Sequence, residues 1–169
     1  MNENFIYEEN AAIDIQQLVQ LGIDSYGPYQ HVLGEPHAAQ LLKNISSEAT
    51  YAALLEMSTL FTCHSGDKLI GMAYYVSAGH PTDIYEAGWS YIRFLAIDPQ
   101  YSGLGVAKRL TKMCIDKSTL TGEHTIALHT SEFMDAARHI YEQAGFIRLK
   151  EIPRRFGKRY WLYTMGLNN

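Results

Sequence analysis

The chain has 169 residues, of which 47% are hydrophobic and 12% aromatic, enough to enclose one core but too few for two full domains. A formal net charge of −4 gives no broad positive field, which argues against nucleic acid as a partner. The acidic start, Met1 to Glu9, is unlike a secretion leader, and no apolar stretch is long enough to cross a bilayer. The sequence therefore predicts one cytoplasmic domain over residues 1–169, without a membrane partner.

The N-terminal part of the chain predicts two helices. Apolar residues recur at helical spacing over Ala11–Asp24, and Gly27-Pro28 then breaks the pattern. A second helix is expected over Pro36–Asn44, because proline suits the first helical position. The pattern over Ala52–Met57 does not distinguish helix from strand.

The middle of the chain predicts strands. Leu60–His64 and Lys68–Ser77 are joined by Ser65-Gly66-Asp67, a turn composed of residues that hairpins use. After a loop, Ser90–Ile97 is apolar on both alternate sets of positions, as in a strand that is covered on both faces. We expect this strand to lie at the centre of a sheet.

The C-terminal half alternates helix and strand. The elements expected there are a helix over Gly105–Asp116, a strand over Thr125–His129, a helix over Asp135–Ala144 ended by Gly145, and an antiparallel pair formed by Phe146–Ile152 and Tyr160–Met165. A right-handed crossover from the central strand to the next strand makes those two parallel. The predicted fold class is therefore α/β, with a mixed sheet between helices.

The strand-to-helix connection Asp98–Ala107 is rich in small residues. Glycines there let backbone N–H groups approach an anion, and the following helix N-terminus adds partial positive charge, so the loop is a candidate pyrophosphate cradle. A tight turn that needs glycine for steric reasons alone is the competing interpretation. A dinucleotide-binding loop is excluded because Lys108 stands where a third small residue is needed, and the Gly-Lys-Ser/Thr ending of a Walker loop is absent.

Two segments of the sequence resemble the GCN5-related N-acetyltransferases (GNAT). The family places Gln/Arg-x-x-Gly-x-Gly/Ala after a Leu-x-Val-x-Pro strand end, which Leu95-Ala96-Ile97-Asp98-Pro99 matches here. The loop fits in two registers, Gln100–Gly105 or Ser102–Ala107, and the second is preferred, with Ser at the Gln/Arg position. A second family segment, Ala-x-x-x-Tyr-x-x-x-Gly-Phe, matches Ala137, Tyr141, Gly145 and Phe146.

The resemblance implies a fold and a reaction. The implied GNAT fold has a central, mostly antiparallel twisted sheet with one parallel strand pair splayed around acyl-CoA, and helices on both faces. The implied activity is N-acetyl transfer from acetyl-CoA (coenzyme A) by direct attack of a primary amine of a small molecule or peptide. The alternative is a non-catalytic acyl-CoA-binding module that acts through a protein partner.

The resemblance also implies which residues bind the cofactor. Backbone groups around Leu95, Ala96 and Ile97 would hold the pantetheine arm and offer an N–H to the thioester oxygen. The remaining cofactor-binding residues implied are Ser102, Gly103, Leu104, Gly105, Val106, Ala107, Lys108, Phe133, Met134 and Ala137.

Two residues are candidates for proton transfer. By the resemblance, Tyr141 is the general acid, since a phenol pKa of about 10 exceeds the thiol value of about 8.5 and leaves a proton to donate. A core tyrosine with a purely structural role is the alternative. The family often places a glutamate where Tyr91 stands, so Glu86 is taken as the base, with Asp83 and His80 as substitutes. Attack by an already neutral amine, or relay through water, stays open.

The acceptor is expected to bind at the turn after the first helix and at the loop from Gly79 to Trp89. The candidate substrate-binding residues are Tyr26, Tyr29, His80 and Tyr91, and the aromatic and acidic residues of these segments favour a small cation or amine. His124 and His129 fall on opposite sides of a strand, so no metal site is predicted. A homodimer through the sheet edge is a further hypothesis.

Overall fold

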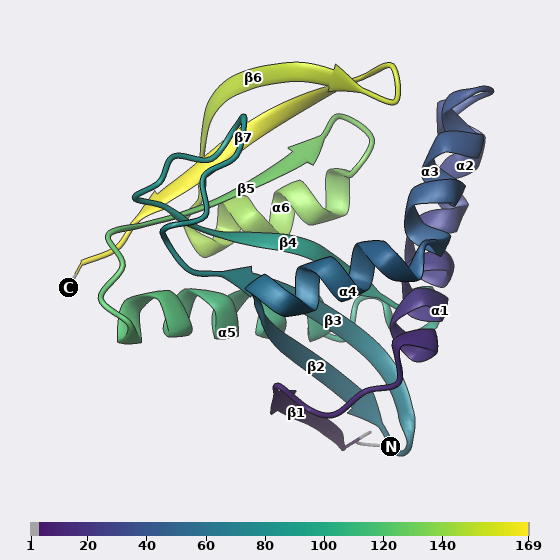
Figure 1. The fold of residues 1–169 in the computed structure, drawn as a ribbon, viewed down its shortest axis with the longest axis horizontal. Helices are drawn as coiled ribbons and strands as arrows, with labels where there is room; N and C mark the ends of the chain where they lie inside the picture. The colour runs from purple at the N-terminus through teal and green to yellow at the C-terminus, as the bar shows by residue number, and fades with distance from the viewer. Residues whose placement is uncertain (1–3, 169) are drawn as a thin grey trace.

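The computed structural model describes residues 4–168, so the expected domain 1–169 extends past the described part at both ends. Seven strands form one sheet in the order β1-β2-β3-β4-β5-β7-β6, with helices on both of its faces (Figure 1). The strands are β1 (Phe5–Glu9), β2 (Thr59–Ser65), β3 (Lys68–Val76), β4 (Ser90–Ile97), β5 (Thr125–Ser131), β6 (Ile147–Arg155) and β7 (Lys158–Gly166).

The helices flank this sheet in two groups. They are α1 (Ile15–Tyr26), α2 (Gln30–Leu33), α3 (His37–Ser46), α4 (Glu48–Met57), α5 (Val106–Leu120) and α6 (Asp135–Ala144), with 3-10 turns at Gly27–Tyr29 and Pro99–Tyr101. Within residues 4–168, β4 and β5 pair in parallel, and the other strand pairs are antiparallel. The mixed sheet with one parallel pair confirms the expected fold class and the central position of β4.

Alternate residues of β3 face two different cores. Ala73 and Tyr75 pack with Leu110 of α5 on one face of the sheet. Met72 and Tyr74 pack with α1 and α4 on the other face. Because β3 is buried on both faces, its side chains connect the two layers of helices and fix the position of β4 beside it.

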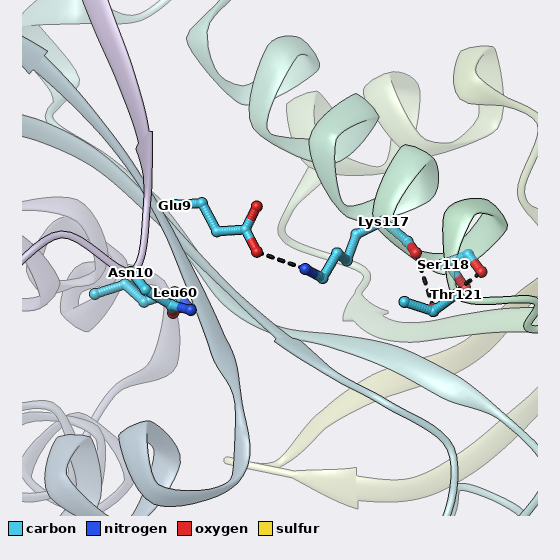
Figure 2. A network of polar contacts seen from close by, with 6 residues as sticks. All are labelled: Glu9, Asn10, Leu60, Lys117, Ser118 and Thr121. Atoms are coloured by element: carbon cyan, nitrogen blue, oxygen red, sulfur yellow. Dashed lines mark hydrogen bonds and ion pairs between the residues drawn. The ribbon is translucent and has the colours of Figure 1, made fainter.

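Strand β1 was not predicted from the sequence. It is an edge strand in which Phe5 and Tyr7 are half-buried while the residues between them are exposed, so its apolar pattern is weak. Two polar contacts hold its end, because Asn10 N–H donates to Leu60 O at 2.7 Å and Lys117 Nζ of α5 lies 2.5 Å from Glu9 Oε1 (Figure 2). Pairing with β2, rather than intrinsic propensity, therefore determines this strand.

The ambiguous stretch before β2 is part of helix α4. This helix buries Tyr51 and Leu54 against α1 and β3, and the Tyr51 hydroxyl donates to Ile45 O at 2.7 Å. α1 begins at Ile15, where the Asp14 side chain accepts a hydrogen bond from Gln16 N–H at 3.0 Å. The packing of α4 against α1 resolves the helix-or-strand choice that the local pattern left open.

Gly22 of α1 is the point of closest approach between these helices. A Cβ there would overlap the Tyr51 hydroxyl and lie 3.2 Å from the Phe94 ring. We expect Gly22→Ala to lower the free energy of unfolding by about 1–3 kcal/mol, since Tyr51 must shift and lose its hydrogen bond. Urea denaturation measures this, with Gly88→Ala as the control because a Cβ at Gly88 meets nothing within 4 Å. Equal midpoints for the two variants would contradict the packing described.

Candidate functional site

The two parallel strands of the sheet separate soon after they pair. β4 and β5 are paired at Ser90 with Ile126 and at Tyr91 with Ala127, and then diverge toward their C-terminal ends (Figure 1). Past Tyr91, polar groups on this edge of β4 bond to side chains of α1 instead of to a strand: Leu95 O accepts from Tyr26 Oη at 2.7 Å and Ile97 N–H donates to Ser25 Oγ at 3.1 Å. The polar backbone groups of β4 thus face a gap rather than a neighbouring strand.

A bulge in β4 lies where this strand diverges from β5. Phe94 has a φ of 51°, and the pairing register with β3 shifts between Met72 and Tyr74. The Phe94 ring packs against Tyr26, with ring centroids 5.1 Å apart, and against Tyr51 at 5.3 Å. The bulge therefore anchors β4 to α1 and α4 where the two strands diverge.

The loop after β4 is held in place by Asp98. Its carboxylate accepts from Gln100 N–H at 2.9 Å and forms an ion pair with Lys68 Nζ at 2.7 Å. Burial by itself would raise the pKa of Asp98, but the hydrogen bonds from Lys68 and Gln100 N–H outweigh it and hold the pKa below its usual value. The ionised carboxylate fixes the turn Pro99–Tyr101. This turn leads into residues 102–105, which we call the glycine loop because it contains Gly103 and Gly105.

The glycine loop opens onto free space at the start of α5. Gly103 and Gly105 have φ angles of 77° and 85°, and a Cβ at either would meet nothing within 4 Å. The first main-chain bond into the helix runs from Arg109 N–H to Gly105 O, so the N–H groups of residues 106–108 point out of the helix end. An anion-binding cradle has these features, and the site fits the diphosphate of coenzyme A.

A cavity of about 270 Å³ lies between β4 and β5 where the strands diverge, lined by residues 92–95 and 128–130 among others. We call it the aromatic cavity, since most of its wall is aromatic or aliphatic. Its lining residues are Tyr26, Tyr29, Leu41, Asn44, Ile45, Thr50, Leu54, Ile92, Arg93, Phe94, Leu95, Leu128, His129, Thr130, Phe133, Met134, Tyr141, Phe156 and Tyr160. The lining contains no carboxylate among the residues the structure describes.

Tyr141 belongs to the core and to the cavity wall at once. It lies on α6, is 7% exposed, and contacts Phe146 edge to face at 6.1 Å. Burial raises the pKa of Tyr141 well above the ordinary phenol value. The side chain is therefore a neutral hydroxyl at the edge of the aromatic cavity, in the protonation state that a proton donor requires.

A half-buried histidine, considered from the sequence only as a metal ligand, also lines the cavity. His129 Nδ1 of β5 lies 2.6 Å from Tyr85 Oη, and the Tyr85 ring stacks on Tyr91 at 4.1 Å. Burial lowers the pKa of His129 to about 3, with further lowering from the positive charges of Arg155 and Arg93. The imidazole is therefore neutral at neutral pH.

The structure separates the predicted site residues into three groups. Those that line the aromatic cavity together are Tyr26, Tyr29, Leu95, Phe133, Met134 and Tyr141. Those at the glycine loop and the first turn of α5 are Ser102, Gly103, Leu104, Gly105, Val106, Ala107 and Lys108. The third group lies away from the cavity and includes Ala96, which packs toward α1, and Ile97 and Ala137, which pack against the core under α5 and α6.

The other members of the third group also lie away from the aromatic cavity. His80 and Glu86 are exposed in the loop between β3 and β4, and neither lines the cavity. Tyr91 is fully buried, and its hydroxyl donates to His80 O at 2.9 Å. The geometry gives Tyr91 the contacts of a core residue, and the roles predicted for His80, Glu86 and Tyr91 stay predictions.

Sequence reasoning did not select Arg93, His129, Phe156 and Tyr160 as site residues. Strand alternation offered one signal, because Ala127 and His129 face one side of β5 while Leu128 faces the other. Using it required the register between β4 and β5, which the sequence does not reveal.

Comparison with known proteins identifies the family. A model described as "Acetyltransferase (GNAT) family" matches residues 26–146, which include the gap, the glycine loop and Tyr141. The chain belongs to the GNAT acetyltransferase family. The resemblance seen in the two sequence segments is thereby confirmed.

Curated relatives of this GNAT chain include two proteins named N-alpha-acetyltransferase 30. N-alpha-acetyltransferase 30 of Saccharomyces cerevisiae is 39% identical over 66 residues, which cover 39% of this chain and 38% of that protein. The protein of the same name from Schizosaccharomyces pombe is 37% identical over 78 residues, which cover 43% of this chain and 52% of that protein. The matches thus span about half or less of those relatives.

Solved structures of low sequence identity share the fold of the GNAT chain. The ribosomal-protein-S18-alanine N-acetyltransferase of Escherichia coli has a TM-score of 0.71 at 17% identity, covering 96% of this chain and 94% of that one. The PaiA N-acetyltransferase of Thermoplasma acidophilum, in complex with coenzyme A, has a TM-score of 0.74 at 13% identity, covering 96% and 99%. Within residues 4–168, no helix has both the length and the apolar character needed to span a membrane.

Proposed function

We propose that this GNAT chain transfers an acetyl group from acetyl-CoA to a primary amine by direct attack of the amine on the thioester. The observation that carries the proposal is the placement of the glycine loop and the aromatic cavity along β4. The aromatic cavity with Tyr141 is lined by residues 92–95 of β4 and 128–130 of β5, where these strands have parted, and the glycine loop with its outward N–H groups follows the C-terminal end of β4. A long thioester with a charged head would span the gap between β4 and β5.

Main-chain groups would do most of the cofactor binding. The N–H groups of residues 106–108 and the glycine loop would hold the diphosphate, and the free edge of β4 would hydrogen-bond the amides of the pantetheine arm. In an extended residue the N–H and C=O point to the same side, and Leu95 O faces Tyr26 across the gap. Leu95 N–H therefore points the same way and would stabilise the negative charge that develops on the thioester oxygen.

Tyr141 would supply the proton for the leaving thiolate. Its raised pKa keeps the hydroxyl protonated, and it lies in the wall of the aromatic cavity where the acyl group would reach. The amine nitrogen adds to the thioester carbon to form the C–N bond, and the adduct then collapses with loss of the C–S bond. The thiolate sulfur takes the phenol proton, and the nitrogen loses its extra proton to water. Tyr141 then recovers a proton from solvent.

The aromatic cavity favours an amine that is already neutral when it binds. Its described lining offers neutral His129 and no carboxylate, so a strong base is lacking. At pH 7.5 an α-amine with a pKa near 8 is about one quarter neutral, whereas a lysine side chain with a pKa near 10.4 is neutral in only about one molecule in a thousand. The site therefore favours the α-amine of a peptide or small molecule, the group for which the two yeast relatives are named.

A thiol-release assay tests this function. A peptide with a free N-terminus and no lysine is compared with an N-terminally blocked peptide that contains one lysine, each with acetyl-CoA. We expect release of coenzyme A to depend on the acceptor and to be at least about 100-fold faster with the free N-terminus, from the difference in neutral amine. Binding of acetyl-CoA without release for any amine would instead support the non-catalytic module.

The assay also examines Glu86. This residue is exposed and outside the aromatic cavity, but its predicted role as the base has its own measurement. If Glu86 takes the amine proton, Glu86→Gln removes the lower limb of the pH profile of kcat/KM. An unchanged profile would show that Glu86 is not the base. The amine would then lose its proton to water beside His129.

A further inference from the structure

Two arginines at or next to the aromatic cavity have no ion-pair partner within residues 4–168. Arg93 comes from β4 and lines the cavity, and Arg155 comes from the end of β6, beside Phe156 of the β6–β7 turn. Both side chains are half-buried. Among residues 4–168, the ion pairs of arginine and lysine involve Lys68, Lys112, Lys117, Arg138 and Arg159 instead.

Arg93 lines the aromatic cavity, and Arg155 directly precedes Phe156, which lines it too. Each arginine lowers the pKa of His129 and opposes the burial that raises the pKa of Tyr85, in keeping with positive charge near the Tyr85–His129 hydrogen bond. The aromatic cavity therefore has a positively charged side.

Half-buried charges without a counter-ion are costly, and a bound anion would offset that cost. The diphosphate of coenzyme A cannot serve, because its loop begins at Ser102, well past the end of β4 at Ile97. Arg93 lies four residues before Ile97, about 13 Å earlier along the strand. The pantetheine arm beside β4 is uncharged, so an anion bound at Arg93 would belong to the acceptor.

We propose that the acceptor carries a carboxylate close to its reacting amine, and that Arg93 and Arg155 bind this carboxylate. The inference rests on the proposed function and names its substrate class. Guanidinium groups match carboxylates with paired hydrogen bonds, and two of them from separate strands would orient the amine toward the thioester. This differs from the small cation that the composition of the acceptor loops favoured, since the acids of that loop lie outside the aromatic cavity.

The carboxylate has two chemical sources, which matched acceptors distinguish. The first pair is a dipeptide with a free C-terminus and the same dipeptide as its C-terminal amide. The second pair is a longer peptide, amidated at its C-terminus, with Glu or Gln as its second residue. Steady-state thiol release with acetyl-CoA gives kcat/KM for each acceptor.

For the wild-type protein we expect kcat/KM to be about 10-fold to 100-fold higher for the carboxylate member of at least one pair, mainly through KM. A preference in the first pair assigns a terminal carboxylate, and a preference in the second assigns an acidic side chain. Arg93→Gln should reduce the preference toward parity, because kcat/KM falls more for the carboxylate acceptor than for its neutral partner. Arg155→Gln provides the same test independently, and Lys112→Gln on α5 is the charge-matched control that should keep the preference.

The outcomes separate this inference from the proposed function. Equal kcat/KM within both pairs, with turnover present, overturns the carboxylate site and leaves the acetyltransferase intact. An equal loss for charged and neutral acceptors in the arginine variants, with acetyl-CoA affinity unchanged by calorimetry, also overturns it, because the arginines would then act on the shared thioester. Absence of turnover with every acceptor overturns the proposed function and the inference with it.

Discussion

Replacing Tyr141 with phenylalanine is expected to lower kcat by about 100-fold or more, the usual contribution of a positioned acid. The change removes one hydroxyl from the wall of the aromatic cavity and keeps the ring that packs against Phe146. The affinity for acetyl-CoA should stay within about twofold, because main-chain groups would carry that binding. Steady-state thiol release and calorimetry on the same preparation measure the two quantities.

Tyr75→Phe is the matched control for this variant. Tyr75 is 2% exposed, belongs to the same core cluster, and its hydroxyl has no hydrogen-bond partner among the described residues. Losing that hydroxyl should leave kcat unchanged. If a folded Tyr141→Phe protein turned over like the wild type, Tyr141 would be a core anchor rather than the general acid.

The second large effect concerns the glycine loop. Gly105→Val places a β-branched residue at a φ of 85° and fills space that is open beside the loop. We expect the affinity for coenzyme A to fall by about 100-fold, from backbone strain and blocked access of the diphosphate. Isothermal titration calorimetry with coenzyme A measures the loss.

Gly122→Val controls for strain alone. Gly122 follows the other end of α5, has a φ of 78°, and a Cβ there also meets nothing within 4 Å. It should cost stability without affecting coenzyme A affinity. Equal affinities for the Gly105 and Gly122 variants would show that the glycine loop does not hold the diphosphate.

The parts of the fold that the sequence predicted share strong local patterns. β4 is apolar on both alternate sets and is buried between two layers, and α5 has one apolar side with a glycine before its first turn. The exceptions are β1, whose exposed acids weaken its alternation, and α4, whose helix depends on packing with α1. Tertiary contacts determine both, and a short local window does not contain them.

The same distinction holds for the candidate site. Tyr141 and the glycine loop were predicted because each is a local motif with fixed spacing. Arg93 and His129 come to one cavity through a parallel pairing of β4 and β5 that lasts only two residue pairs, and Arg155 directly precedes the cavity residue Phe156, whose φ is 51°. Glu86 was predicted from its charge and its position before β4, yet the loop leaves it exposed. Register and turn geometry, rather than residue type, decide which polar side chains reach the cavity.

The most direct test of the account is calorimetric titration of the wild-type protein with acetyl-CoA and with coenzyme A. The gap between β4 and β5 and the outward N–H groups at α5 predict saturable binding of one molecule per chain, with a dissociation constant between about 1 μM and 1 mM. Binding should weaken sharply in Gly105→Val and persist in Tyr141→Phe. No binding of either ligand to the folded wild-type protein would contradict the acetyltransferase function and the carboxylate site that depends on it.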